Sequence, residues 1–322
     1  MDDITVLIIG KVDAAQLGLL KRLDKKVRIL LAESSEDALA KASEADVVFI
    51  WAASRDTLRE VLPKATRAKW IHGRFAGLDH VSSPEIAALP IPFTNGRGVF
   101  SQSLGEFVLG AILYFAKDFP RMRRAQQAAR WDPFDVLEIS KQTMGIIGYG
   151  DIGKACAWRA KAMGMKVLAL RRSPERSAGD PHVDYVYGWD ARLEMIAASD
   201  YVVAAAPLTA ETQGMISDTE FAAMKPTGVM INVGRGPVID EPAMIRALES
   251  GRIKGAGLDV TSVEPLPADS PLYRMDNVLL SPHCADHTVD WLDDAMNFFL
   301  EQLDRFRNRQ PLQNVVDLNR GY

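Results

Sequence analysis

The stretch TMGIIGYGDIGKACAWRAKAMG, residues 143–164, is the most informative part of this sequence for its fold. A short apolar run leads into glycines at Gly148, Gly150 and Gly153, and a helix-like stretch follows. Glycines at this spacing allow a tight turn, close approach of backbone N–H groups to a pyrophosphate, and close packing of the helix on the strand. The stretch therefore predicts a strand–turn–helix unit that binds a dinucleotide. A glycine-rich turn without a ligand is the alternative.

The next strand-like run, KVLALRRSPER at residues 166–176, bears on the choice of dinucleotide. An acidic residue about 20 positions after the glycine motif would bind a ribose 2′-hydroxyl, but this chain has Arg171, followed by Arg172 and Ser173. These side chains can bind a 2′-phosphate through charge-assisted hydrogen bonds. We therefore expect NADP(H) to be preferred and keep NAD(H) as possible. A solvated basic loop is the alternative interpretation of the two arginines.

Short apolar runs alternate with amphipathic stretches along the whole chain. Runs that are apolar throughout and rich in Val and Ile suit strands buried on both faces of a parallel sheet, with helices between them. The runs form two series, so we expect an α/β fold with two doubly wound parallel sheets. The first series lies at residues 5–10, 27–32, 46–51, 69–73 and 91–96, and the second at 143–148, 166–171, 201–206, 228–233, 254–260 and 277–281.

Two long amphipathic stretches separate these series from each other and from the end of the chain. Residues 101–127 predict one long connecting helix, and residues 287–308 predict a second. The tail at residues 311–322 is expected to return to the first domain. We therefore expect a discontinuous first domain, residues 1–98 with 288–322, and a dinucleotide-binding domain at residues 99–287.

Length and composition limit the possible functions. At roughly 150 residues per domain, 322 residues suggest two domains. The net charge of −4 provides no positive field for a nucleic acid or an anionic membrane, and no apolar stretch is long enough to cross a bilayer. The acidic N-terminus does not resemble a signal peptide, so the expected compartment is the cytoplasm. Cys156 and Cys284 match no zinc-binding spacing and are expected to be reduced thiols, and we expect no metal site.

Three further segments are expected as loops at strand ends, where open α/β sheets bind ligands. They are INVGRGPVID (231–240), GLDVTSVEPLP (257–267) and LLSPHC (279–284), and they contribute Arg235, Glu264 and His283. An arginine provides a planar fork for a carboxylate and a carbonyl oxygen, and a histidine supplies a proton near neutral pH. A glutamate beside the histidine would fix its tautomer and favour its charged form. Taken singly, each residue also has a purely structural interpretation.

The order and spacing of these segments resemble the D-isomer-specific 2-hydroxyacid dehydrogenases, which include glyoxylate/hydroxypyruvate reductases. The resemblance covers most of the chain, including IHGRFAGLDHV (71–81), PLTAET (207–212), SPHCADHT (281–288) and the tail at 311–322. It implies a Rossmann cofactor domain and a flavodoxin-like substrate domain. It also implies a homodimer that uses the connecting helix, and a small 2-oxo or 2-hydroxy acid as substrate.

The resemblance also implies roles for individual residues. Arg235 would bind the substrate carboxylate and polarise the C2 carbonyl, His283 would be the acid/base, and Glu264 would orient it. Backbone N–H groups of Ala76, Gly77 and Leu78 would bind the substrate carboxylate, and Asp259 would bind the nicotinamide carboxamide. The implied cofactor contacts comprise Ser101, Gly148, Gly150, Asp151, Ile152, Gly153, Arg171, Arg172, Ser173, Ala206, Pro207, Thr212, Val233, Gly234, Arg235, Asp259, His283 and Ala285.

Several positions lie outside the family pattern or have an open role. Many relatives have glycine two residues after the histidine, whereas this chain has Ala285 and then Asp286. Arg74 is either a second cation for the substrate or a surface residue. Cys284 is expected to pack rather than act as a nucleophile, because no base is arranged for it. The tryptophans Trp131 and Trp291 are expected to pack between domains.

The expected reaction is the reduction of a small 2-oxo acid, such as glyoxylate or hydroxypyruvate, to the D-2-hydroxy acid. Two alternatives remain open at this point. The same fold could serve an NAD-dependent dehydrogenase of a bulkier D-2-hydroxy acid. It could also serve a non-catalytic, cofactor-sensing protein that resembles a transcriptional corepressor.

Overall fold

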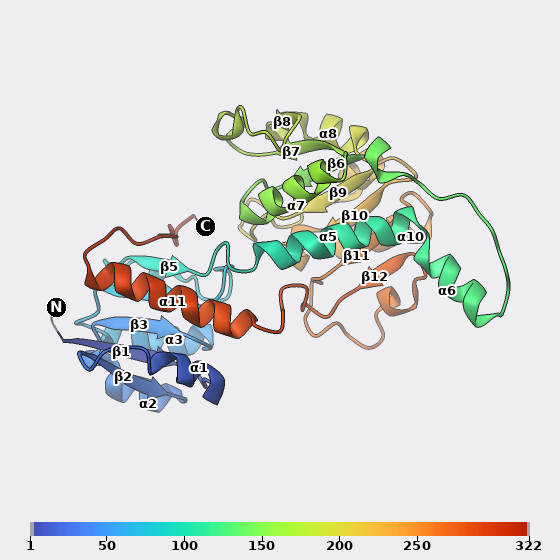
Figure 1. Cartoon of the computed structure of the whole chain (residues 1–322). Helices are drawn as coiled ribbons and strands as arrows, with labels where there is room; N and C mark the ends of the chain where they lie inside the picture. Colours follow the sequence, from blue (N-terminus) through green and yellow to red (C-terminus); the bar gives the residue numbers. More distant parts are fainter. Residues whose placement is uncertain (1–2, 321–322) are drawn as a thin grey trace. The chain divides into compact units, whose positions relative to one another are not determined.

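The computed structural model describes residues 3–320, which form two compact units (Figure 1). The first unit contains the described residues up to Phe100 together with those from Thr288 onward, and the second unit is Ser101–His287. Each unit contains one parallel sheet with helices on both faces. The α/β class with two doubly wound sheets is therefore confirmed.

The sheet of the first unit has five parallel strands in the order β2-β1-β3-β4-β5. This order, 2-1-3-4-5, is that of flavodoxin-like folds. The pairing β1–β3 brings Ile9 opposite Ile50, and the pairing β3–β4 brings Ile50 opposite Gly73, so these strands end at one edge. The strands are β1 (Ile4–Ile9), β2 (Val27–Ala32), β3 (Val47–Ile50), β4 (Trp70–Gly73) and β5 (Phe93–Asn95).

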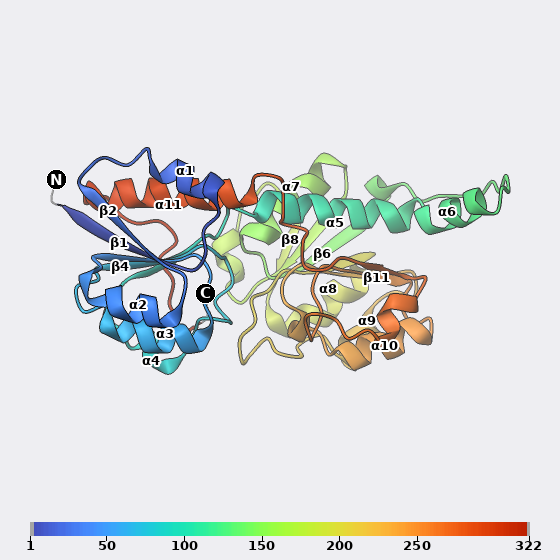
Figure 2. The ribbon, with the colours of Figure 1, turned by 90° about the horizontal axis from the view of Figure 1, so that it is seen from below.

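Alternate residues of each strand in the first unit pack on opposite helical layers. Val6 and Ile8 of β1 belong to a core with the helices α1 and α11, whereas Leu7 and Ile9 belong to a core with α2, α3 and α4. Figure 2 shows these two layers on either side of the sheet. The helices are α1 (Ala14–Leu20), α2 (Ser35–Lys41), α3 (Arg55–Val61), α4 (Pro84–Ala87) and α11 (Trp291–Arg307).

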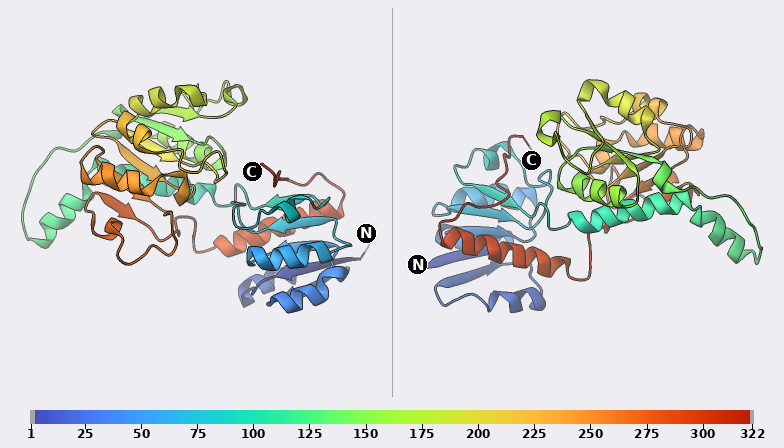
Figure 3. Two further views of the ribbon diagram at one scale, coloured as in Figure 1. Left: turned by 180° about the vertical axis from the view of Figure 1, so that it is seen from behind. Right: turned by 45° about the horizontal axis from the view of Figure 1, so that its top comes forward.

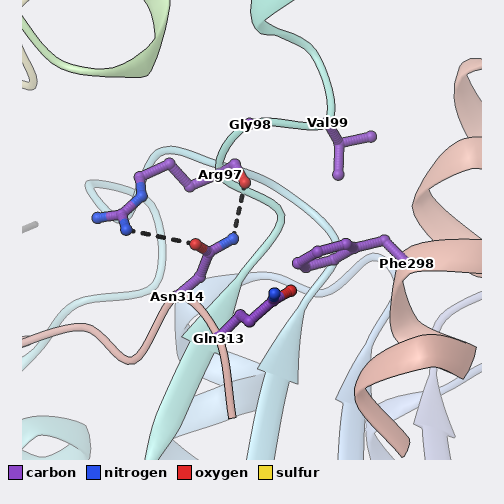
Figure 4. A pocket seen from close by; sticks show the side chains of 6 residues that line it. All are labelled: Arg97, Gly98, Val99, Phe298, Gln313 and Asn314. Atoms are coloured by element: carbon purple, nitrogen blue, oxygen red, sulfur yellow. Dashed lines mark hydrogen bonds between the residues drawn. The ribbon is translucent and has the colours of Figure 1, made fainter.

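The C-terminal tail packs on the first unit. Val315 forms an antiparallel bridge with Thr94, and the Val316 N–H donates to the Phe93 carbonyl at 3.0 Å. Asn314, with φ of 54°, donates through its Nδ2 to the Arg97 carbonyl at 2.7 Å and accepts from the Arg97 guanidinium at 3.3 Å (Figure 4). These bonds, which border a cavity of about 580 Å³, attach the tail to the end of β5. Residues 321–322 lie outside the described part of the chain.

The sheet of the second unit has seven parallel strands in the order β12-β11-β10-β9-β6-β7-β8. If the strands are numbered 1 to 7 in chain order within this unit, the order read from β8 is 3-2-1-4-5-6-7. It begins with the Rossmann order 3-2-1-4-5-6. The direction of strand addition reverses between β6 and β9. The strands are β6 (Thr143–Ile147), β7 (Lys166–Leu170), β8 (Tyr185–Tyr187), β9 (Tyr201–Ala204), β10 (Val229–Asn232), β11 (Gly255–Leu258) and β12 (Val278–Leu280).

Helices cover both faces of this second sheet (Figure 2). The helices α5 and α7 pack on Ile146 and its neighbours, whereas α8, α9 and α10 pack on Ile147 and its neighbours. A Cβ atom at Gly105 of α5 would lie 3.0 Å from the Ala155 carbonyl oxygen of α7, so the two helices pack closely. The helices are α5 (Ser101–Ala116), α6 (Phe119–Gln127), α7 (Asp151–Ala162), α8 (Arg192–Ala198), α9 (Asp218–Ala223) and α10 (Glu241–Glu249).

Some local predictions were wrong. Residues 101–127 form two helices, α5 and α6, instead of one (Figure 3), because Pro120 cannot continue a helix and Asp118 adopts a left-handed φ of 50° to cap α6. The edge strand β8 was not predicted, because it has three residues and none of them is buried. Trp131 does not pack, since its side chain is 96% exposed.

No helix within residues 3–320 combines the length and the apolarity that crossing a bilayer requires.

Candidate active site

The glycine motif lies at the carboxyl end of β6, beside the point where strand addition reverses. Gly148 follows the strand with φ of 94°, and Gly150 is the N-cap of α7. Open α/β sheets bind ligands in the crevice at such a reversal, and the N-terminus of a twelve-residue helix favours an anion.

The surroundings of the three glycines differ. A Cβ atom at Gly148 would lie 2.6 Å from the Ala206 nitrogen, and one at Gly153 would lie 2.5 Å from the Gly148 carbonyl oxygen. These two glycines are therefore required by the turn and by close packing of α7. At Gly150 a Cβ would meet no described atom within 4 Å, so the backbone there has space in front of it for a pyrophosphate. Asp151 and Ile152 are the first two residues of α7.

The basic cluster lies at the carboxyl end of β7, next to β6 in the sheet. Arg171 is half-buried and donates through Nη1 to the Ser177 Oγ at 2.5 Å. Arg172 is exposed and forms an ion pair with Glu211, a partner that the sequence analysis did not consider. Ser173 is the N-cap of a short 3₁₀ helix, Pro174–Ser177.

The loop after β9 borders the glycine motif from the other side. Ala206 is buried against Gly148, and Pro207 is exposed. The Thr212 hydroxyl donates to the Pro207 carbonyl at 2.6 Å and accepts from the Thr209 N–H at 2.8 Å, which fixes the turn. The structure thus brings the predicted residues of this loop to the same sheet edge as the glycine motif.

His283 and Glu264 are hydrogen-bonded, although 19 residues separate them in the sequence. The distance between His283 Nδ1 and Glu264 Oε2 is 2.7 Å, and the two side chains are 41% and 37% exposed. The other oxygen, Glu264 Oε1, accepts from the Thr261 N–H at 3.0 Å and is thereby oriented. With Nδ1–H assigned to this bond, Nε2 is the ring nitrogen that remains for proton exchange with a substrate.

Asp259 organises the histidine loop, a role that the sequence analysis missed. The Asp259 side chain is 2% exposed, and its Oδ1 accepts from the Ser281 hydroxyl at 2.7 Å and from the Cys284 and Ala285 N–H groups at 3.0 Å each. The Asp259 carbonyl accepts from the His283 N–H at 2.8 Å. His283 has φ of 53°, a conformation that non-glycine residues adopt at a cost and that these four bonds hold.

Arg235 follows β10 and lies on the loop adjacent to that of Glu264. The buried Asn232 fixes its backbone, because its Nδ2 donates to the Arg235 carbonyl at 3.0 Å and its Oδ1 accepts from the Gly234 N–H at 3.1 Å. A Cβ at Gly236 would come within 1.9 Å of the Thr261 carbonyl oxygen, so the two loops touch. The ends of β10, β11 and β12 thus carry Arg235, Glu264 and His283 at one edge of the sheet.

The remaining residues that were predicted to contact the cofactor lie at the carboxyl edge of the second unit's sheet or on α5. Val233 and Gly234 are buried at the end of β10. Ser101 is buried at the start of α5. Ser103, which the sequence analysis did not single out, donates through its hydroxyl to the Ala285 carbonyl at 2.5 Å and so attaches α5 to the histidine loop.

The loop with Ala76, Gly77 and Leu78 belongs to the first unit and follows β4. The buried Asn95 side chain donates to the Ala76 carbonyl at 2.6 Å, and the Gly96 N–H donates to the Phe75 carbonyl at 2.8 Å. Leu78 is buried in the core. These contacts hold the loop at the carboxyl edge of the first sheet.

Three residues with open roles have defined surroundings. The Arg74 guanidinium is stacked between the rings of Trp51 and Trp291, 4.7 and 4.9 Å from their centroids, within the first unit. The packing prediction for Cys284 was wrong, since the residue is exposed. The Asp286 Oδ1 is buried and has no hydrogen-bond partner among the described residues, and burial raises the pKa of this carboxyl.

The described residues contain no group of three or more His, Cys, Asp or Glu side chains that could hold a metal ion. Both cysteines are free.

Residues 109–285 match the family model described as D-isomer specific 2-hydroxyacid dehydrogenase, NAD binding domain. The fold and the loops at the sheet edge thus define the class, an NAD(P)-binding oxidoreductase with a Rossmann sheet. Because the match covers more than half of the chain, the protein belongs to the D-isomer-specific 2-hydroxyacid dehydrogenase family. The family predicted from the sequence is confirmed.

Relatives and solved structures agree with this family. The chain is 32% identical over 268 residues to a glyoxylate reductase of Korarchaeum cryptofilum, covering 80% of this chain and 79% of that protein. It is 30% identical over 296 residues to a D-3-phosphoglycerate dehydrogenase of Methanocaldococcus jannaschii, covering 91% of this chain and 56% of that protein. A D-isomer specific 2-hydroxyacid dehydrogenase of Xanthobacter autotrophicus, solved with NADPH and MES, is 30% identical with a TM-score of 0.85 and covers 99% of this chain and 100% of that chain.

Proposed function

We propose that the protein reduces small 2-oxo acids, with glyoxylate and hydroxypyruvate as the first candidates, to D-2-hydroxy acids and prefers NADPH. The observation that carries this proposal is the 2.7 Å bond between His283 Nδ1 and Glu264 Oε2, on loops beside that of Arg235. Carbonyl reduction needs a proton donor and a cation that stabilises the carbonyl oxygen. His283, which the Glu264 carboxylate orients, and Arg235 at the same sheet edge can provide these two groups. The names of the glyoxylate reductase relatives support the substrate class.

In the proposed reaction, Arg235 binds the substrate carboxylate and stabilises negative charge that develops on the carbonyl oxygen. Preorganised donors of this kind typically contribute a few kcal/mol to transition-state stabilisation. His283 gives a proton from Nε2 to the same oxygen, and Glu264 holds the ring in the orientation that this transfer requires. The bound cofactor supplies the hydride for the carbonyl carbon. The backbone of Ala76, Gly77 and Leu78 is proposed to bind the carboxylate of the same substrate.

The preference for NADPH is proposed from Arg171, Arg172 and Ser173, which follow β7 where an NAD-binding sheet usually ends in an acidic residue. The solved relative with NADPH supports this choice. Asp259 is also proposed to bind the nicotinamide carboxamide, as the family resemblance implies, in addition to the three hydrogen bonds that its Oδ1 accepts from the histidine loop.

The test follows cofactor absorbance with glyoxylate, hydroxypyruvate and a larger 2-oxo acid, each with NADPH and with NADH. We expect His283→Ala to lower turnover by orders of magnitude while NADPH still binds. Arg235→Gln should likewise lower turnover, because it removes the cation proposed to bind the substrate. Arg246→Gln is its matched control, because Arg246 lies on α10 and pairs with the exposed Asp218. If the protein binds a dinucleotide but reduces none of the acids, the proposed activity is wrong and a non-catalytic binding protein is favoured. Reduction of the larger acid with NADH alone would favour the bulkier-substrate alternative.

A homodimer is proposed from the surface of α6 and the segment that follows it, which projects from the second unit (Figure 3). Phe119, Met122, Trp131, Val136 and Leu137 are large apolar side chains exposed along this arm. Clustered exposed apolar residues mark association sites. Sedimentation equilibrium should give twice the chain mass, and Trp131→Ser with Met122→Ser should shift the protein toward the monomer.

A cytoplasmic location is also proposed, and the two free cysteines fit it.

A further inference from the structure

An ion pair joins the two loops that flank the glycine motif. Arg172 follows β7, Glu211 lies on the loop after β9, and the sheet order places β6 between these two strands (Figure 1). Neighbouring strands lie about 4.8 Å apart, so the pair bridges about 10 Å. The bridge therefore passes across the carboxyl end of β6, where Gly148 begins the dinucleotide motif.

The two arginines after β7 are held in different ways. Arg171 is half-buried and bonded to Ser177 within its own loop, whereas Arg172 reaches across to the opposite loop. The side chains of Arg172 and Glu211 are 60% and 70% exposed. Exposed ion pairs are weak and open readily, because solvent screens the charges and holding two long side chains costs entropy.

We propose that Glu211 is a specificity-determining residue that competes with the 2′-phosphate of NADP(H) for Arg172. This inference rests on the proposed use of NADP(H). A 2′-phosphate is a monoester with a charge of about −1.5 to −2 at neutral pH, so the Glu211 carboxylate repels it and also engages its arginine. NAD(H) carries a hydroxyl at the same position and does not compete for Arg172. Glu211 thus lowers the affinity for NADP(H) relative to NAD(H), and Arg171 provides the phosphate contact that Glu211 does not oppose.

The test measures dissociation constants of NADPH and NADH for the full-length protein by fluorescence titration, without substrate. In Glu211→Gln, which leaves an exposed polar side chain in place, we expect the NADPH constant to fall about three- to fivefold. The NADH constant should stay within about twofold, since screened interactions at this distance act mainly on the added phosphate. Titration with 2′,5′-ADP and 5′-AMP should reproduce the same contrast without the nicotinamide.

Asp218→Asn is the matched control. Asp218 pairs with Arg246 in the same unit at 2.7 Å. The Arg246 and Asp218 side chains are 57% and 71% exposed, close to the values for Arg172 and Glu211. Its loss should leave both constants unchanged. Measured against Arg172→Gln alone, the double variant Arg172→Gln with Glu211→Gln should show a smaller gain than Glu211→Gln shows over wild type, because only the direct repulsion of the phosphate remains without the arginine.

The outcomes separate this inference from the proposed function. An NADPH constant that does not fall in Glu211→Gln, while wild type binds NADPH and reduces a 2-oxo acid, overturns the inference alone. An equal gain for NADH, or an undiminished gain in the double variant, also overturns it, because a general effect of charge would then be responsible. If wild type binds neither dinucleotide, both proposals fail.

Discussion

Replacement of Asp259 by alanine should both destabilise the protein and lower its catalytic rate. The variant removes the acceptor of three hydrogen bonds, from the Ser281 hydroxyl and from the Cys284 and Ala285 N–H groups, and the native side chain is 2% exposed. A hydrogen bond to a charged group contributes about 1.5–3 kcal/mol, so the two amide bonds alone would sum to about 3–6 kcal/mol. Because Cys284 is exposed and water can replace part of this loss, we expect the free energy of unfolding to fall by about 2–4 kcal/mol.

The effect on activity should be larger than the effect on stability. Asp259 holds the loop in which His283 adopts its left-handed φ of 53°, and displacement of a reacting group by about 1 Å can cost about 100-fold in rate. Urea unfolding followed by tryptophan fluorescence gives the stability, and cofactor absorbance gives the rate. Asp240→Ala is the control, because Asp240 caps α10 by accepting one N–H at 3.0 Å and its loss should cost only about 1 kcal/mol. A loss below about 1 kcal/mol in Asp259→Ala with a rate within threefold of wild type would refute this reasoning.

Three further predictions concern single side chains. Glu264→Gln should lower kcat by about 10- to 100-fold with an unchanged NADPH dissociation constant, because it loses the charged acceptor of His283; an unchanged kcat measured by absorbance would contradict this role. Burial lowers the pKa of His72 to about 3, below its unfolded value of about 6.5, so the unfolded chain binds more protons between these pH values and stability is lost as pH falls through that window. Between pH 7 and pH 5, His72 should lower the free energy of unfolding, measured by urea titration, by about 2 kcal/mol. His72→Gln should lack this part of the pH dependence. Asp118→Ala should cost about 1–2 kcal/mol of unfolding free energy, measured by thermal melting, because it removes the cap of α6 and leaves alanine at φ of 50°; an unchanged melting temperature would argue against the cap.

Much of the fold could be predicted from local patterns. Apolar runs such as residues 46–51 contain a strand, here β3 (Val47–Ile50), because a strand buried on both faces needs apolar side chains at every position. The glycine motif predicts its own turn, since Gly148 has the positive φ that glycine adopts at low cost. The half-exposed edge strand β8 and the break at Asp118 were missed, because the first lacks an apolar run and the second is a single capping residue within an apolar pattern.

The strands, the dinucleotide motif and the presence of Arg235, Glu264 and His283 could be predicted from local sequence, because each depends on residues close together in the chain. Which groups meet in space depends on the tertiary fold. The bonds from Asp259 to Ala285 and the pair of Arg172 with Glu211 join residues 26 and 39 positions apart. The parallel sheet creates these contacts, since it aligns the carboxyl ends of strands that are distant in sequence, and no local pattern encodes which neighbours a strand will have.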